Sequence, residues 1–115
     1  MTRQVLLLDL KDEPALIAAY EAWHAPGAVP RPVVKSIREG GVSSMEIYRA
    51  GDRLVMLIEC TEDHAHKCKA AADADDPAVR AWEERMDEFQ QRLPCAAPGE
   101  KWVPAKRIFS LDEQP

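Results

Sequence analysis

The 115-residue chain is 46% hydrophobic and 30% charged, and its formal net charge at pH 7 is −5. A chain of this length can bury one core, so we predict a single domain over residues 1–115. The acidic balance argues against general binding of nucleic acids or anionic membranes, because both need a surplus of Lys and Arg on one surface. We therefore expect a small, uncharged ligand.

The lack of a recognisable targeting signal and the cysteine usage lead us to expect a cytoplasmic protein. No apolar run approaches the roughly 18 residues of a membrane span, and the stretch 5–10 is too short and too acidic for the apolar region of a signal peptide. The three cysteines, Cys60, Cys68 and Cys95, are odd in number and lack CxxC spacing, so we expect free thiols in a reducing compartment.

The first half of the chain is predicted to form a strand followed by two helical pieces. Residues 3–10 are almost continuously apolar, which is typical of a central strand. A helix then begins with Asp12 as its N-cap, and the proline-rich bend 25–32 interrupts it. The second piece, Pro32–Glu39, ends at Gly40-Gly41, which is typical of a left-handed C-terminal cap.

The second half is predicted to contain a hairpin, a long helix and a last strand. Apolar residues alternate from Val42 to Ala50 and from Arg53 to Cys60, and Gly51-Asp52 joins these two strands. An aspartate-rich turn caps a helix from Pro77 to Leu93, and Trp102 to Leu111 is expected to be a strand.

The order of these elements predicts the fold. Strand, helix, strand, strand, helix, strand is the order of the ferredoxin-like βαββαβ arrangement, an α+β fold whose antiparallel sheet has its helices on one face. The other face stays open, and in so short a chain it leaves apolar surface exposed. A homodimer that covers this face, a dimeric α+β barrel, is therefore expected.

The stretch 61–72 is also predicted to be helical, and it contains the spacing His64-x-His66-x-Cys68. On a helix, His64 and Cys68 share a face whereas His66 points elsewhere, so three metal ligands cannot converge locally. No fourth ligand is evident in the sequence. We expect a solvated polar face here and no metal site.

Tyr20 and His24 are the candidate catalytic residues. Residues four apart lie on one helical face, so the phenol and the imidazole can reach the same ligand. An imidazole with a pKa of about 6.5 gives or takes a proton near neutral pH, and a phenol can orient a hydroxyl or a ring oxygen. The spacing alone leaves open that Tyr20 is a core aromatic and His24 a solvated residue near a helix end. Asp9 and Glu46 are further polar candidates by strand position, without an assigned role.

An ordered set of motifs runs through most of the chain. They are Tyr20-x-x-x-His24 before a proline-rich bend, the helix end 35–41, the strands 43–48 and 54–59, and the helix that contains Trp82. Together they resemble the L-rhamnose mutarotase family. The resemblance implies a dimeric ferredoxin-like protein that interconverts the α and β anomers of a 6-deoxy-hexopyranose without a cofactor. It also implies that His24 is catalytic, that Tyr20 assists it, and that Trp82 lines the sugar pocket, although its helical spacing alone is typical of a core residue.

Two departures from the family pattern concern the sugar pocket. The family's bend usually reads His-Asn/Asp-x-x-Trp-Pro-Glu, whereas here it is one residue longer, with Val29 and Arg31 nearest to the missing Trp and Glu. The family's Trp-Trp pair is here Trp82-Glu83. A smaller apolar group and a reversed charge must change which hydroxyls are matched, so we expect L-fucose to be preferred over L-rhamnose, with Arg31 as a hydroxyl donor.

Two other functions stay open beside mutarotation. A cofactor-independent oxygenase or isomerase of the dimeric α+β barrel class would use the same architecture for an aromatic substrate. A non-enzymatic dimeric binding module would use Tyr20 and His24 only for packing. Ligand-induced stabilisation separates the three, because sugars, aromatics or neither would raise the melting temperature.

Overall fold

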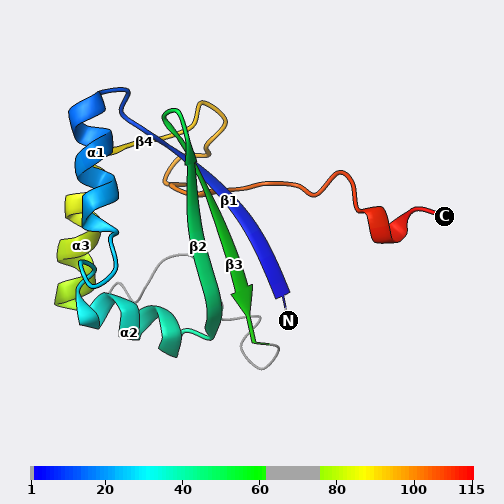
Figure 1. Cartoon of the computed structure of the whole chain (residues 1–115), viewed down its shortest axis with the longest axis horizontal. Coiled ribbons are helices and arrows are strands. Elements are labelled where there is room, and N and C mark those ends of the chain that lie inside the picture. Colours follow the sequence, from blue (N-terminus) through cyan, green and yellow to red (C-terminus); the bar gives the residue numbers. More distant parts are fainter. Residues whose placement is uncertain (1, 62–75) are drawn as a thin grey trace.

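The computed structural model describes residues 2–61 and 76–115. Its elements follow one another as a strand, two helices, a hairpin, a third helix, two very short strands and a 3-10 turn (Figure 1). In chain order they are β1 (Thr2–Leu10), α1 (Pro14–Trp23), α2 (Arg31–Glu39), β2 (Val42–Ala50), β3 (Arg53–Cys60), α3 (Pro77–Asp87), β4 (Gln90–Gln91), β5 (Val103–Pro104) and η2 (Leu111–Glu113).

The strands form one antiparallel sheet in the order β2-β3-β1-β4, with β5 also paired to β1. This is the ferredoxin-like order, in which the short β4 and β5 together occupy the place of the last strand. The three α-helices lie on one side of the sheet (Figure 1). The predicted α+β fold is confirmed.

The hairpin of β2 and β3 has the predicted bounds. Ala50 pairs with Arg53, so the two-residue loop Gly51-Asp52 joins the strands, and Gly51 has a φ of 62°. Glycine adopts this left-handed conformation without steric cost, which is why it suits a tight hairpin turn. The predicted end of α2 is confirmed in the same way, because Gly41 has a φ of 92°.

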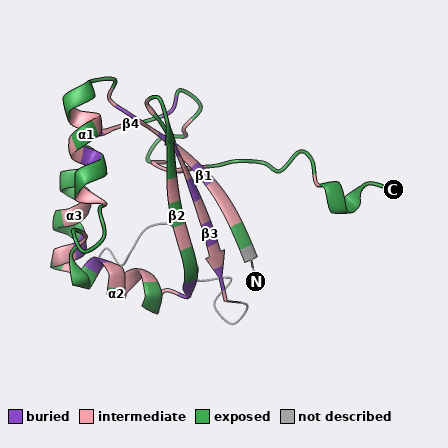
Figure 2. Ribbon diagram, viewed as in Figure 1, coloured by how far each residue is buried: buried purple, intermediate pink, exposed green. Residues whose placement is uncertain are grey.

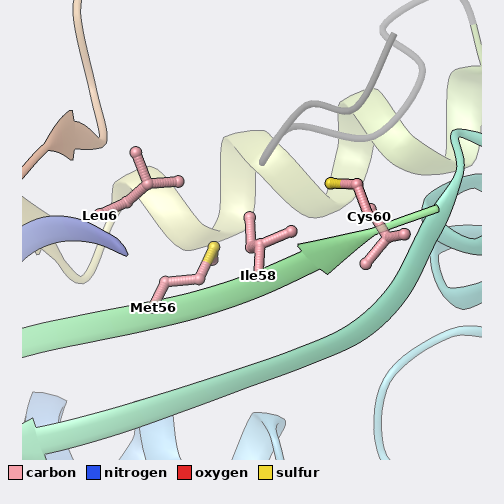
Figure 3. Packing of buried hydrophobic residues seen from close by; sticks show 5 residues of the cluster. Leu6, Met56, Ile58 and Cys60 are labelled. Atoms are coloured by element: carbon pink, nitrogen blue, oxygen red, sulfur yellow. The ribbon is translucent and has the colours of Figure 1, made fainter. Parts of the chain in front are cut away.

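The core lies between the sheet and the helices. Along β3 the buried residues alternate with partly exposed ones, and Leu54, Met56, Ile58 and Cys60 are at most 4% exposed (Figure 2). Figure 3 shows Met56, Ile58 and Cys60 on the same side of this strand. One buried cluster joins these residues to β1 and β2, and a second joins Leu54 to Tyr20 and α3. The central strand therefore anchors both ends of the core.

The opposite side of the sheet is not covered by any helix of the described residues. Strand alternation places on it the half-buried side chains of Val5, Leu7, Val55 and Leu57, together with Tyr48, which is 52% exposed. We call these five residues the open face. Ion pairs between neighbouring strands border it, Asp9 with Arg53 at 2.8 Å and Glu59 with Arg3 at 3.0 Å.

The predicted last strand is wrong beyond Pro104. Val103 and Pro104 pair with β1, the Ala105 amide donates to the Val5 carbonyl at 2.8 Å, and the chain then leaves the sheet. Proline has no amide hydrogen to donate, which limits the ladder at this point. Residues 106–115, the C-terminal arm, extend away from the body of the molecule (Figure 1), and their large apolar side chains are exposed: Ile108 by 90%, Phe109 by 64% and Leu111 by 74%.

Two helix boundaries also differ from prediction. The helix predicted to reach Leu93 ends at Asp87, because the chain turns there and Gln90–Gln91 pair with β1. Phe89 and Leu93 are buried nonetheless, so the apolar spacing continued past the helix. The predicted N-cap Asp12 is exposed, and Glu13 occupies the cap position without a side-chain hydrogen bond, since Pro14 needs no amide partner in the first turn.

One cysteine prediction is wrong. Cys60 is disulfide-bonded, whereas Cys95 is a free, exposed thiol. The expectation relied on cysteine count and spacing, and neither reports which sulfur atoms the fold brings within bonding distance. The predicted helix 61–72, apart from Thr61, and its His64, His66 and Cys68 lie outside the described residues. Within the described ranges, no helix has the length and apolar character that a membrane crossing requires.

Candidate active site

A cavity of about 440 Å³ opens between α1, α2, α3 and the hairpin. Such a volume is in the usual range for small-molecule sites. Part of its wall is apolar, formed by Val29, Val33, Val34, Ile37, Val42, Met45, Ile47, Met56 and Met86. The rest carries aromatic and polar side chains, namely Tyr20, His24, Arg38, Ser43, Ser44, Trp82, Glu83, Gln90 and Trp102. The cavity therefore suits a ligand that has both apolar groups and hydroxyls.

Tyr20 and His24 lie side by side in this cavity at the C-terminal end of α1. Their ring centroids are 4.3 Å apart, as expected for residues one helical turn apart. His24 Nδ1 is 2.7 Å from the backbone carbonyl oxygen of Tyr20. A carbonyl only accepts, so Nδ1 carries a hydrogen, and in the neutral ring Nε2 is then the basic nitrogen.

Burial sets the ionisation of His24. The removal of water from the half-buried ring lowers its pKa below 6.5, and the hydrogen bond to the Tyr20 carbonyl opposes this effect only in part. The imidazole is therefore neutral at pH 7, with Nε2 ready to accept a proton.

The hydroxyl of Tyr20 stays protonated. Burial raises the pKa of Tyr20 to about 12, a hydrogen bond from Gln90 lowers it, and the nearby charge of Glu83 raises it. Gln90 Nε2 donates to the Tyr20 hydroxyl oxygen at 3.3 Å. Because that oxygen already accepts, its own hydrogen can be donated to a ligand in the cavity.

Trp82 forms an aromatic wall beside His24. The two ring centroids are 5.3 Å apart at an interplanar angle of 68°, and Trp82 also packs edge-on against Trp23 at 6.3 Å. The guanidinium of Arg85 lies over the Trp23 ring, 4.8 Å from its centre. Trp82 is only half-buried, so it borders the cavity as well as packing in the core.

The sequence profile of the L-rhamnose mutarotase family matches residues 3–111. The chain belongs to this family. Its members are sugar isomerases, so the protein is a mutarotase. It is 52% identical over 113 residues to the L-fucose mutarotase of Xanthomonas campestris pv. campestris, an alignment that covers 98% of this chain and 90% of that protein.

Two solved structures share the fold of this mutarotase. The L-rhamnose mutarotase of Formosa agariphila has a TM-score of 0.67 at 16% identity, with 96% of this chain and 99% of that chain covered. Tetracenomycin F2 cyclase from Streptomyces glaucescens, a type II polyketide cyclase, has a TM-score of 0.56 at 19% identity, with 96% of each chain covered. At these identities the similarity concerns the fold alone.

The other predicted residues of the mutarotase lie elsewhere. Arg31 is exposed at the start of α2 and lines a neighbouring groove that His24 and Arg38 also line, whereas the cavity itself includes Arg38 and not Arg31. Asp9 pairs with Arg53, and Glu46 is an exposed residue on the same side of the sheet. The structure thus brings Tyr20, His24 and Trp82 together, places Arg31 in the groove next to them, and leaves Asp9 and Glu46 on the opposite face of the sheet.

Two residues near the cavity of the mutarotase, Gln90 and Lys101, were not predicted from sequence. Glu83, which the family comparison had placed at the sugar pocket, lines the cavity as Gln90 does. Gln90 lies four residues after Met86, at the spacing of the apolar stripe, so that stripe could have indicated it. Lys101 Nζ is 2.8 Å from Glu83 Oε2 and 2.8 Å from Asp87 Oδ1. It comes from a loop, and no local pattern in the sequence links it to α3.

Proposed function

We propose that the protein interconverts the α and β anomers of L-fucose, with L-rhamnose as a poorer substrate, and that His24 is the acid–base catalyst. The observation that carries this proposal is the position of the His24 ring beside Tyr20 and Trp82 in one cavity, with Nδ1 held by the Tyr20 carbonyl so that Nε2 is the basic nitrogen. The 52% identity to a protein named L-fucose mutarotase supports the choice of sugar.

The reaction needs one proton to move between two oxygens on the same carbon. Neutral His24 accepts the proton of the anomeric hydroxyl and, as imidazolium, donates it to the ring oxygen while the C1–O5 bond breaks. The open aldehyde rotates about C1–C2, and the reverse steps close the ring on its other face. Both oxygens are bonded to C1, so one nitrogen can serve both. Tyr20 donates its hydroxyl hydrogen to a sugar oxygen and holds the ring in place.

The mixed lining of the cavity supports a 6-deoxy sugar. The methyl group at C6 carries no hydroxyl and matches apolar lining residues, for example Val33, Ile37 and Met45. The polar lining side chains can bond the ring hydroxyls, and Trp82 can stack on the C–H face of the pyranose. Arg31 lies outside this cavity, so Arg38 takes its place in the proposal as the guanidinium nearest the sugar.

Sugar preference tests this proposal. L-Fucose and L-rhamnose differ in configuration at C2 and C4, so a site that bonds those hydroxyls leaves a buried polar group unpaired with the wrong sugar, at roughly 1–3 kcal/mol for each group. We expect faster enzyme-dependent exchange for L-fucose than for L-rhamnose, and least for D-glucose. Saturation-transfer NMR on the anomeric protons at equal concentrations measures all three. Equal acceleration of the three sugars would contradict a tuned pocket, and faster exchange of L-rhamnose would reverse the assignment.

We also propose that the protein is a homodimer. The open face presents four half-buried aliphatic side chains and the exposed ring of Tyr48, and the C-terminal arm exposes three more apolar side chains. A second copy that covers these surfaces would remove them from water. The cavity with His24 lies on the other side of the sheet, so each subunit would keep a complete site.

A charge on the open face should disrupt the dimer. Leu57→Glu places a carboxylate in the middle of that face. The carboxylate must lose its bound water if a second copy packs there. In sedimentation equilibrium at micromolar concentration we expect a dimer for the parent and a monomer for the variant. Ala22→Glu adds the same charge to an exposed position of α1 and should remain dimeric. A monomeric parent would refute the dimer, and a dimeric Leu57→Glu would place the interface elsewhere.

A further inference from the structure

We infer that Gln90 binds a ring hydroxyl of the substrate and fixes the hydroxyl of Tyr20 at the same time. The inference rests on the proposed function, since it concerns the same cavity. Its starting point is the side-chain oxygen of Gln90, which is buried and has no hydrogen-bond partner among the described residues. A buried amide oxygen without a donor loses its bonds to water and gains nothing in return.

The position of Gln90 makes this oxygen available to a ligand. Its backbone is fixed in β4 by pairing with Leu10 of β1, and its side chain lines the cavity. Nε2 is used, because it donates to the Tyr20 hydroxyl at 3.3 Å. The carboxamide therefore has one end held by Tyr20 and the other free to accept a hydrogen bond.

A sugar hydroxyl fits this arrangement better than water-excluding apolar groups would. Each ring hydroxyl can donate a hydrogen to Gln90 Oε1, which has no other donor within the described part of the chain. The hydroxyl hydrogen of Tyr20 can be donated to a neighbouring sugar oxygen. Glu83 adds a further acceptor to this wall: its Oε2 is bonded to Lys101 at 2.8 Å, which holds the carboxylate in place. This part of the lining thus offers two acceptors, Gln90 Oε1 and the Glu83 carboxylate, and one donor, the Tyr20 hydroxyl.

Gln90 would also affect the reaction rate through its hydrogen bond to Tyr20. With Nε2 on the phenol oxygen, the Tyr20 hydrogen cannot turn toward Gln90 and is left for the sugar. Gln90 is thereby a binding residue through Oε1 and a positioning residue through Nε2. The first role should appear mainly in KM, and the second mainly in kcat.

Fluorinated sugars test the binding role. In the three L-fucose analogues with fluorine in place of the hydroxyl at C2, C3 or C4, the substituted position can no longer donate a hydrogen. For the parent we expect one analogue to lose roughly tenfold to a hundredfold in kcat/KM relative to L-fucose, as for a lost buried hydrogen bond. Gln90→Met, which has a similar length and no amide, should lose a similar factor with L-fucose but no longer distinguish that analogue from it.

Two further variants keep the test decisive if Gln90→Met does not fold, which circular dichroism would reveal. Gln90→Glu retains an acceptor and should retain the discrimination. Tyr20→Phe removes the partner of Nε2, so it should lower kcat while the discrimination persists. Two results would overturn the inference. One is a Gln90→Met variant that still distinguishes the fluorinated analogue from L-fucose. The other is loss of that distinction in both Gln90→Glu and Tyr20→Phe. A parent that does not accelerate L-fucose would overturn the proposed function itself, and with it this role of Gln90.

Discussion

Replacing His24 with asparagine is expected to reduce enzyme-dependent exchange of L-fucose anomers by about 10²- to 10⁴-fold while the protein stays folded. Asparagine places an amide nitrogen near the position of Nδ1, so the hydrogen bond to the Tyr20 carbonyl, now 2.7 Å, can be kept. It has no counterpart of Nε2, the nitrogen that we propose accepts the anomeric proton. Saturation transfer between the anomeric protons measures the remaining rate. Glu84→Gln, at an exposed position of α3, is the control.

The pH profile of the parent supplies a second readout for His24. Its pKa is lowered below 6.5 by burial, and the neutral form is the one that accepts a proton. The rate should therefore be level near pH 7 and fall on the acid side, with a midpoint below pH 6.5. If His24→Asn exchanged anomers as fast as the parent, or if the parent rate fell on the alkaline side of pH 6.5 instead, His24 would not be this base.

The second large effect is expected in the core. Ile58 is 0% exposed on the central strand β3, where it packs in the cluster that joins β1, β2 and β3. Ile58→Ala removes buried methyl groups and leaves a cavity that the neighbouring strands cannot fill, which should lower the free energy of unfolding by about 2–5 kcal/mol. Urea denaturation followed by circular dichroism measures the change, with all proteins at one concentration because association adds to stability.

A matched substitution shows whether the loss comes from packing. Ile58→Val deletes one methylene and should cost about 0.5–1.5 kcal/mol. If Ile58→Ala cost no more than Ile58→Val, the site would be loosely packed, contrary to its burial. A change in the slope of the urea transition would instead indicate that the substitution altered the compactness of the folded or unfolded state.

The features that the sequence predicted well depend on near neighbours in the chain. The hairpin followed from alternation around Gly51-Asp52, and both strands have the predicted ends. Tyr20 and His24 share a cavity because one helical turn separates them. Trp82 was placed by the family resemblance, since its spacing alone also fits a core residue.

The features that were missed depend on contacts between distant segments. Trp102 to Leu111 was predicted to be a strand because of its large apolar residues, but β1 pairs only with Val103–Pro104, and Ile108, Phe109 and Leu111 are exposed. Gln90 looks like a continuation of the helix stripe until its pairing with Leu10 is known. Lys101 reaches Glu83 from a loop, and Arg31 lines a groove next to the cavity. Local periodicity contains none of this information.

His24 is held by α1, whereas part of the cavity wall comes from the bend that follows this helix. His24 is the C-cap residue of α1 and is held by the carbonyl of Tyr20, so its position is set before the chain enters the bend 25–30. Val29, by contrast, borders the cavity from within the bend, and Val33 returns the chain to the core at 2% exposure. Insertions or substitutions between these two fixed points can therefore change the cavity wall without moving the His24 nitrogen that we propose transfers the proton. Under the proposed mechanism, a new sugar preference would need only a different bend, and the helical turn that holds Tyr20 and His24 would stay the same.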